Sequence, residues 1–283
     1  MDNTQAGALK SAELQTAKEL YLAWQQDKKD NPIEPARHPL KTQLLISLTS
    51  YRPRLRTLHL TVRSLLEQTI QPDCILIWLT REDLALLPRK SEFSHEGVRI
   101  EICDDLRSYK KLVPALMRHP NAVIVTADDD AYYHRFWLSQ LVQEYNEGND
   151  ILCHVAYRIH FEPDGGVAPY GEWTKDVQDR MSRQPSTDLL PIGVGGVLYP
   201  PGSLSNAATA SLLFNRTCPG CDDLWFYAMA KLKGTRTRKV GRRLYQVLWP
   251  GTQEKALWLD NFAFNNDVSI RNLVAKYGPD LFA

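Results

Sequence analysis

The sequence has no long apolar run and almost no net charge, and both absences narrow the classes of protein to which it can belong. No stretch approaches the ~18 apolar residues that a membrane-spanning helix needs. The 34 basic and 33 acidic side chains leave a formal net charge of +1. Bulk electrostatics therefore favours neither nucleic acid nor an anionic membrane as a partner, and any anion site must be local.

Cysteine is also scarce. Five cysteines among 283 residues do not suggest the framework of a small secreted disulfide protein, and the polar N-terminus lacks the apolar segment of a signal peptide. We therefore expect a cytoplasmic protein with reduced thiols. Cys218 and Cys221 have a C-x-x-C spacing, but no second such pair exists, which disfavours structural zinc. A disulfide across this turn is equally disfavoured if the thiols are reduced.

The N-terminal 40 residues are predicted to form a helical extension and a linker. Residues 9–28 place an apolar stripe at helical spacing, and the three prolines of residues 27–39 indicate a linker. We expect the helix to pack on the main domain, with a partner or membrane contact as the alternative. The main domain is then residues 41–283. The stripe consists of Leu14, Ala17, Leu20, Tyr21 and Trp24.

Short apolar runs alternate with helical patterns in the first part of this domain, to about residue 155. Runs rich in Val, Ile and Leu that alternate with helices are typical of a mostly parallel sheet covered on both faces. The fold class is therefore predicted as α/β. From about residue 156 to 202 Gly, Pro and aromatic residues dominate, so that part is predicted to be irregular. The expected strands are 43–49, 74–79, 98–103, 122–127 and 150–155, and the expected helices are 54–69, 108–119, 135–147, 221–234 and 265–278.

Three aspartates, Asp128, Asp129 and Asp130, follow the expected strand 122–127 directly. Their mutual repulsion must be offset by solvent, by basic side chains or by a metal ion. Alternate residues of an extended segment point the same way, so Asp128 and Asp130 could hold Mg²⁺ or Mn²⁺, which prefer oxygen ligands. A solvated acidic turn that caps the next helix is the other interpretation.

Four features occur in an order that resembles GT-A fold glycosyltransferases of the inverting family 2 type. The helical segment ends in S-L-L-E-Q-T at 64–69 and leads into Q-P-D at 71–73. The acidic triplet follows its apolar strand at 123–130, a glycine-rich segment spans 193–202, and an acidic pair opens an aromatic helix at 221–230. The resemblance covers most of the chain and is closer to small bacterial enzymes of surface-polysaccharide synthesis than to processive synthases.

The resemblance implies a nucleotide-sugar donor, most often a UDP-sugar, and a saccharide or lipid-linked saccharide acceptor. Residues from about 41 to 155 would then form the donor half and residues from about 156 to 283 the acceptor half. Mn²⁺ or Mg²⁺ on Asp128 and Asp130 would stabilise the departing diphosphate. The residues that the resemblance places at the nucleotide are Thr49, Ser50, Tyr51, Arg52, Asp104, Lys110, Lys111, Asp128 and Asp129.

Each nucleotide contact has a structural alternative. The segment from Thr49 to Arg52 also suits a plain turn, Asp104 suits a helix N-cap, and Lys110 and Lys111 suit a solvated helix face. For the base that inversion requires, the resemblance points to Asp222 or Asp223, with Asp222 the first choice. An acidic start of a helix, favoured by the helix dipole, is the alternative.

The acceptor side is predicted less specifically. Gly193, Gly195 and Gly196 suit either a flexible turn that lets backbone approach a sugar or a tight loop between short strands. Trp173 and Trp225, with Tyr170 and Tyr199, offer faces for sugar stacking or belong to the core. Residues 231–243 hold seven basic side chains, which suit a diphosphate grip at the inner face of a membrane or a solvated basic face.

Three rival functions remain at this point. A nucleotidyltransferase shares the sheet and the nucleotide but usually has a glycine-rich loop after its first strand, where this chain has T-S-Y-R-P-R at 49–54. A metal-dependent phosphohydrolase would need further metal ligands. A non-catalytic nucleotide- or carbohydrate-binding protein is the third. The sequence does not predict an oligomeric state.

Overall fold

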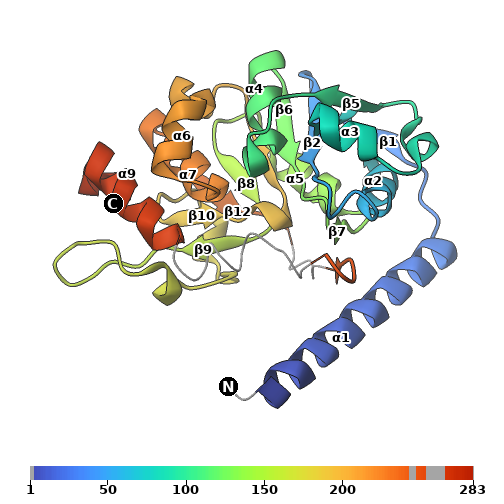
Figure 1. The fold of residues 1–283 in the computed structure, drawn as a ribbon, viewed down its shortest axis with the longest axis horizontal. Helices are drawn as coiled ribbons and strands as arrows, with labels where there is room; N and C mark the ends of the chain where they lie inside the picture. Colours follow the sequence, from blue (N-terminus) through green and yellow to red (C-terminus); the bar gives the residue numbers. More distant parts are fainter. Residues whose placement is uncertain (1–2, 242–246, 253–264, 283) are drawn as a thin grey trace.

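The centre of the protein is a seven-stranded, mostly parallel sheet (Figure 1). The structure is a computed structural model and describes residues 3–241, 247–252 and 265–282. Four of the strand pairings are parallel, and only β11 runs antiparallel to its two neighbours. The expected α/β class is confirmed. In sheet order the strands are β12 (Thr237–Lys239), β8 (Ile151–Cys153), β11 (Val197–Tyr199), β6 (Val123–Thr126), β2 (Leu44–Thr49), β4 (Cys74–Leu79) and β5 (Val98–Ile102).

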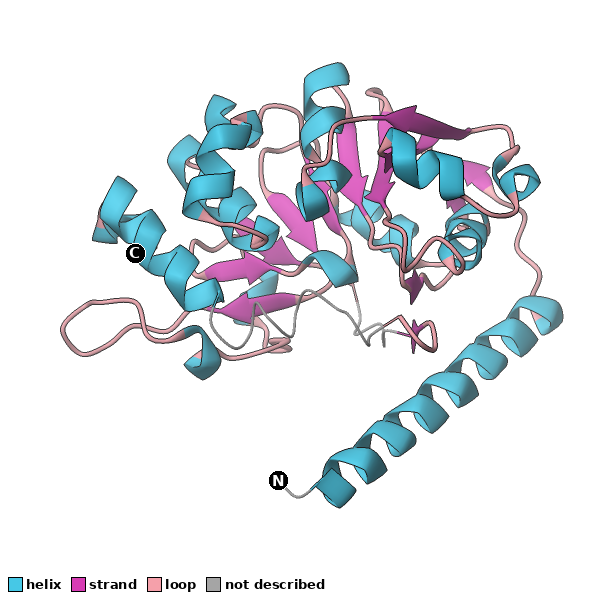
Figure 2. Cartoon of the chain, viewed as in Figure 1, coloured by secondary structure: helices cyan, strands magenta, loops and turns pink. Residues whose placement is uncertain are grey.

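Helices cover both faces of this sheet, as Figure 2 shows. Successive residues of β2 point to opposite faces, so Leu45 joins one core cluster while Leu44 and Ile46 join the other. Because both faces are buried, the central strands read as unbroken apolar runs. One face packs against α2 (Leu58–Leu66) and α5 (Trp137–Glu144); the other packs against α4 (Val113–Arg118), α6 (Ser211–Thr217), α7 (Asp222–Lys233) and α9 (Asn266–Tyr277).

Shorter elements complete the fold. The part expected to be irregular, residues 156–202, is mostly loop, with short strands and 3₁₀ turns set into it. The shorter elements are β1 (Ala36–Arg37) with β3 (Ile70–Gln71), β7 (Ala131–Tyr132) with β13 (Val247–Leu248), β9 (Ala156–Arg158) with β10 (Leu189–Pro191), helix α3 (Arg81–Leu86), and the 3₁₀ turns Lys90–Phe93, Arg107–Lys111, Tyr170–Glu172, Met181–Arg183, Gly193–Gly195, Asn206–Thr209 and Pro279–Leu281.

The N-terminal helix α1 (Asn3–Asp30) is longer than expected and points away from the sheet (Figure 1). Its later part packs on the main domain, where Leu20, Tyr21 and Trp24 contact a small aromatic cluster. The side chains of Leu14 and Ala17 lie outside the described ones. Among the described residues, no helix combines the length and apolar character that crossing a bilayer requires.

The glycine-rich segment is a tight turn between two short strands, β10 and β11. A Cβ on Gly193 would lie 2.5 Å from Lys111 Nζ, and one on Gly195 would lie 2.6 Å from Val155. Gly196 has φ +89°, and a Cβ there would lie 2.5 Å from the indole nitrogen of Trp137. Glycine is therefore required here by protein packing, and of the two interpretations of this segment the tight loop is the one that the structure shows.

Replacing Gly196 with Ala should destabilise the protein much more than replacing Gly202. Gly202 also has a positive φ, +73°, but a Cβ there meets nothing within 4 Å. Gly202→Ala should therefore cost only the left-handed strain, about 1 kcal/mol, whereas Gly196→Ala adds overpacking against Trp137 and should cost about 3 kcal/mol. Urea unfolding measures both. Equal losses would show that the contact with Trp137 is not what requires glycine.

Candidate active site

The acidic triplet lies at the carboxyl end of β6, beside the end of the parallel strand β2. The register pairs Ser47 of β2 with Thr126 of β6. The segment after β2 and the triplet therefore lie side by side at the same edge of the sheet. In open parallel sheets this edge is where ligands bind. Asp129 and Asp130 are buried, each 4% exposed, whereas Asp128 is partly exposed. The three carboxylates therefore do not form a solvated turn.

Arg54 compensates two of these charges. Its guanidinium lies 2.9 Å from Asp129 and 3.0 Å from Asp130, and Ser50 Oγ donates a hydrogen bond of 2.5 Å to Asp129. Burial raises the pKa of Asp129, and Arg54 and Ser50 oppose that rise. The sequence analysis did not predict this pairing, and the position of Arg54 shortly after the strand end was the available signal for it.

Lys111 joins the triplet to the acidic pair at the start of α7. Its ammonium lies 3.1 Å from Asp128, 2.9 Å from Asp222 and 4.0 Å from Asp223. The hydroxyl of Ser47 donates to the Lys111 carbonyl and fixes its backbone to β2. Although burial lowers the pKa of Lys111, the three carboxylates together raise it well above its usual value. Residues almost a hundred positions apart thus meet at one cation.

Asp223 is the carboxylate of this group that a bound molecule can reach most easily. Its side chain is 30% exposed, compared with 10% for Asp222, which holds Lys111 more closely. The backbone N–H of Gly193 donates to Asp223 over 3.1 Å. Burial, with smaller contributions from Asp222 and Asp128, raises the pKa of Asp223 to about 7, against the lowering effect of Lys111. Asp223 is thus the more exposed acid of the pair, whereas the sequence put Asp222 first as the base.

Tyr133 connects the triplet to the glycine turn, and the sequence interpretation missed it. The N–H of Asp128 donates to the Tyr133 hydroxyl over 2.7 Å, and that hydroxyl donates to the carbonyl of Val194 over 3.3 Å. Tyr133 is buried. Its position three residues after the triplet was the only sequence signal.

A second cluster of acids surrounds Lys110, at the ends of β4 and β5. The Lys110 ammonium lies 3.7 Å from Asp83 and 3.5 Å from Asp105, and it donates to the Ser50 carbonyl over 3.5 Å. Lys110 is buried, so the solvated-face alternative is wrong for it, as it is for Lys111. Asp104 is exposed, and it is Asp105 that accepts a hydrogen bond from the N–H of Arg107.

The residues that close β2 have distinct surroundings. The Thr49 hydroxyl donates a hydrogen bond to the carbonyl of Trp78 over 2.8 Å, and the Ser50 hydroxyl donates to Asp129. Tyr51 stays partly exposed, with the Arg54 guanidinium 5.6 Å from its ring centre, and Arg52 is exposed. Thr49 and Tyr51 are thus partly exposed and Arg52 is exposed, and the contact of these residues with a nucleotide stays a prediction.

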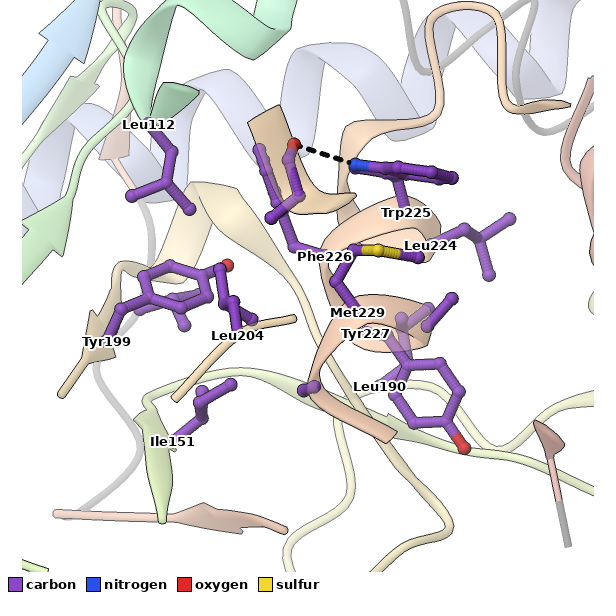
Figure 3. Close-up of a cluster of buried hydrophobic side chains, with 14 of the residues drawn as sticks. Leu112, Ile151, Leu190, Tyr199, Leu204, Leu224, Trp225, Phe226, Tyr227 and Met229 are labelled. Atoms are coloured by element: carbon purple, nitrogen blue, oxygen red, sulfur yellow. Dashed lines mark hydrogen bonds between the residues drawn. The ribbon is translucent and has the colours of Figure 1, made fainter. Parts of the chain in front are cut away.

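The prediction that Trp173 and Trp225 present faces to an acceptor is wrong. Trp173 is 3% exposed and Trp225 is fully buried. The Trp225 indole N–H donates to the carbonyl of Ala208 within the packed cluster of Figure 3. Tyr170 and Tyr199 are buried as well. Large aromatic side chains fill the core on this face of the sheet.

The basic stretch of residues 231–243 does not form a continuous basic face in its described part. Arg236 pairs with Asp150 at 3.5 Å and Arg238 with Glu144 at 3.0 Å, and Lys239 is 1% exposed. Residues 242 and 243 lie outside the described residues. Cys218 and Cys221 are buried free thiols. These observations give no support to a membrane-facing basic patch.

The charges at the site fit a divalent cation that arrives with a ligand, and do not fit an all-protein metal cage. Among the described residues, no three His, Cys, Asp or Glu side chains are arranged to hold a metal ion, because Lys111 and Arg54 lie between the carboxylates. Five carboxylates nevertheless pair with these two cations. Mg²⁺ commonly takes one or two carboxylates and completes its shell with water and phosphate. The side chain of Asp128, 27% exposed, is better placed for this than the side chain of Asp130, which is 6% exposed and paired with Arg54.

Comparisons with known proteins give only distant similarities. No family model matches the chain, and no curated protein matches it. Among solved structures, it is similar to the mannosyltransferase PcManGT from Pyrobaculum calidifontis in complex with GDP-Man and Mn²⁺, with 13% identity, 96% of this chain and 81% of that one covered, and a TM-score of 0.46. It is also similar to the inositol-1-phosphate CTP transferase from T. maritima, with 7% identity, 78% and 96% covered, and a TM-score of 0.45.

A third structure in this group is 4-diphosphocytidyl-2C-methyl-D-erythritol synthase from Anaerococcus prevotii, with 12% identity, 78% and 95% covered, and a TM-score of 0.47. The first two are transferases by name, and the third is a synthase by name. Similarities at these identities and TM-scores assign neither a family nor an activity to this chain.

Replacing Asp223 with Asn should stabilise the protein more at pH 8 than at pH 5. The pKa of Asp223 is about 7 in the folded protein, above its value in an unfolded chain, about 4. Ionising the folded carboxyl is therefore unfavourable, and wild-type stability falls as the pH rises through 7. Asn removes this loss and can still accept the N–H of Gly193. Thermal unfolding in EDTA measures the difference. Glu172→Gln, at an exposed acid, is the control, and a variant that is less stable at pH 8 contradicts the assignment.

Replacing Lys111 with Met should destabilise the protein by about 3–5 kcal/mol, because buried carboxylates lose their cation. Lys111→Met combined with Asp222→Asn should lose less than Lys111→Met alone, since one carboxylate is neutralised at the same time. Urea unfolding at pH 8 measures both variants. Equal losses in the single and double variants would show that Asp222 and Lys111 are not coupled.

Proposed function

We propose that this protein is an inverting glycosyltransferase that moves a sugar from a nucleotide-sugar to a saccharide or lipid-linked saccharide acceptor, in polysaccharide or glycoconjugate synthesis. The observation that carries the proposal is the meeting of Asp128, Asp222 and Asp223 at the Lys111 ammonium. Asp128, which could hold a metal ion at the donor diphosphate, thus lies next to Asp222 and Asp223, which could activate an acceptor hydroxyl.

The donor is proposed to lie along the carboxyl ends of β2, β4 and β6. Tyr51 and Arg52 border this edge with exposed surface and can contact the base or phosphate. Lys111 and Arg54 place positive charge beneath the diphosphate, which stabilises the charge that develops when the bond to the sugar breaks. A bound Mn²⁺ or Mg²⁺ would be held mainly by Asp128, with Asp130 as the second acid at the site. It would supply Lewis-acid stabilisation of the same leaving group.

Asp223 is the proposed general base. Its carboxylate takes the proton from the acceptor hydroxyl; the hydroxyl oxygen then bonds to the anomeric carbon of the sugar, and the anomeric carbon–phosphate oxygen bond breaks with its electron pair leaving on the diphosphate. A base works best when its pKa lies near the working pH, and the raised pKa of Asp223 meets that condition. Asp222 and Gly193 hold Lys111 and Asp223 in place.

A nucleotidyltransferase is the rival that shares this sheet and this nucleotide edge. Its chemistry joins a nucleoside triphosphate to a sugar phosphate and releases pyrophosphate. That reaction attacks with an anionic phosphate and needs no base for a hydroxyl. The paired acids beside the triplet therefore favour glycosyl transfer.

Turnover assays distinguish these reactions. The wild type should release a nucleoside diphosphate from at least one member of a panel of UDP-glucose, UDP-galactose, UDP-N-acetylglucosamine and GDP-mannose in Mn²⁺, faster with saccharide acceptors present. Asp223→Asn should lower kcat by a factor of about 10²–10⁴ and leave the donor KM nearly unchanged. Asp128→Asn should raise the donor KM, and Glu172→Gln should change neither. Pyrophosphate release from nucleoside triphosphates with sugar phosphates would instead identify a nucleotidyltransferase.

The pH dependence provides an independent check. Because the proposed base must be ionised, kcat/KM should fall on the acidic side with an apparent pKa well above that of an ordinary aspartate, and this limb should be altered in Asp223→Glu. A profile that is flat down to pH 5 would exclude Asp223 as the base.

A further inference from the structure

The backbone of the acidic triplet is held from behind by residues that are remote in sequence. The N–H of Trp249 donates to the Asp130 carbonyl over 2.8 Å. The hydroxyl of Thr61 lies 2.9 Å from the carbonyl of Asp129 and 3.0 Å from that of Ala131. The Trp249 indole N–H in turn donates to Thr61 over 2.8 Å. These bonds use the carbonyls of the turn and leave its carboxylates facing Arg54 and Lys111.

The N-terminal helix packs directly on this arrangement. The Trp24 ring stacks on that of Tyr132, with ring centres 5.5 Å apart, and Tyr21 lies 5.3 Å edge-on from Tyr132 and 5.9 Å from Trp249. The side-chain amide of Gln25 donates to the Tyr132 hydroxyl over 3.2 Å. Tyr132 is only two residues from Asp130, so α1 reaches the acidic turn through a single aromatic layer.

The junction of α1 with the domain is also fixed by charge. Arg135, which is buried, pairs with Asp27 at 2.7 Å and donates to the carbonyl of Asn31 over 2.6 Å. The backbone carbonyl of Arg135 accepts from Thr69 N–H. The segment from Ala131 to Arg135 is therefore attached to α1 at both its ends.

This aromatic cluster is separate from the two large cores. Its buried members are Tyr132, Val247 and Trp249, with Leu20, Tyr21, Trp24 and Leu60 packed around them. The central sheet and its helices are stabilised by the other two clusters. Loss of a contact in this cluster should therefore act on the acidic turn before it acts on global stability.

We propose that α1 and residues 247–252 form a clamp that positions the acidic turn, with Trp24 and Trp249 as positioning residues for the proposed donor site. The turn needs such support because neighbouring carboxylates repel one another, and side chains hold them in a fixed geometry only if the backbone cannot relax. The role in donor binding rests on the proposed function; the positioning of the turn does not.

Hydrogen exchange at the amides of residues 128–133 tests the clamp without any assay of activity. Trp24→Ala should raise the exchange rate of these amides about tenfold while leaving those of β4 unchanged. Trp249→Phe, which keeps an aromatic ring but removes the indole N–H bond to Thr61, should raise the exchange rate by a smaller factor. Leu22→Ala is the matched control on α1, because Leu22 is 55% exposed and should leave the turn unaffected.

A second control separates positioning from general destabilisation. Leu273→Ala, in the buried face of α9, should lower the melting temperature without raising exchange in the turn. Unchanged exchange at residues 128–133 in Trp24→Ala overturns the proposal, and so does an equal rise in Leu273→Ala.

Binding of Mn²⁺ alone, followed by electron paramagnetic resonance of the free ion, distinguishes this proposal from the proposed function. Trp24→Ala should bind Mn²⁺ about tenfold more weakly than the wild type and Leu22→Ala. If the wild type binds no Mn²⁺, the proposed metal is wrong, and the exchange data alone decide on the clamp. If it binds Mn²⁺ and Trp24→Ala binds it equally, the clamp does not position the site.

Discussion

The arrangement of this site depends on one buried ammonium group. Lys111 lies within 4.0 Å of three carboxylates that come from β6 and from the start of α7, and its backbone is fixed to β2 by Ser47. Without this cation, two acidic segments would repel each other across the junction of the regular and irregular halves. The glycine turn between β10 and β11 passes so close to the ammonium that Gly193 has no room for a side chain. The cation thus determines which residue types can surround it, as well as where the acids lie.

Much of this fold could be predicted from sequence because the central strands are buried on both faces. Burial on both faces produces unbroken apolar runs such as Leu44–Thr49 and Cys74–Leu79, and these were located to within a residue or two. Strands β11 and β12 were missed, since each has three residues and sits among glycine or basic residues. Such short strands exist because neighbours in the sheet provide their hydrogen bonds, and local propensity does not reveal that.

The sequence could predict the acidic residues of the candidate site. It could not predict the cations that pair with them or the residues that hold their backbone. Asp128, Asp222 and Asp223 stand out because paired carboxylates after an apolar run or before a helix need an explanation. Whether Lys111 or solvent compensates their charge depends on which groups lie close together in the fold, and the sequence does not reveal that. The prediction for Trp173 and Trp225 was wrong for the opposite reason. An aromatic ring suits both a sugar-binding surface and a core, and only its burial in the fold distinguishes the two roles. Thr61 and Tyr133 carry no chemical signal at all, because each acts by a hydrogen bond to backbone that the fold brings to it.

The excess of acid over base explains why such a site would remain only partly neutralised. A protein under selection for stability alone would pair every carboxylate or replace it, since buried charges without partners are costly. Here five carboxylates share Arg54 and Lys111, and burial, with smaller contributions from Asp222 and Asp128, raises the pKa of Asp223. Strongly perturbed carboxyls of this kind cluster at functional sites. Under the proposed function, a cation that binds here would relieve this repulsion, so the same charges that destabilise the protein would strengthen binding of a metal–diphosphate ligand. A site without these net negative charges would make the protein more stable but would attract a cation-bearing ligand less strongly.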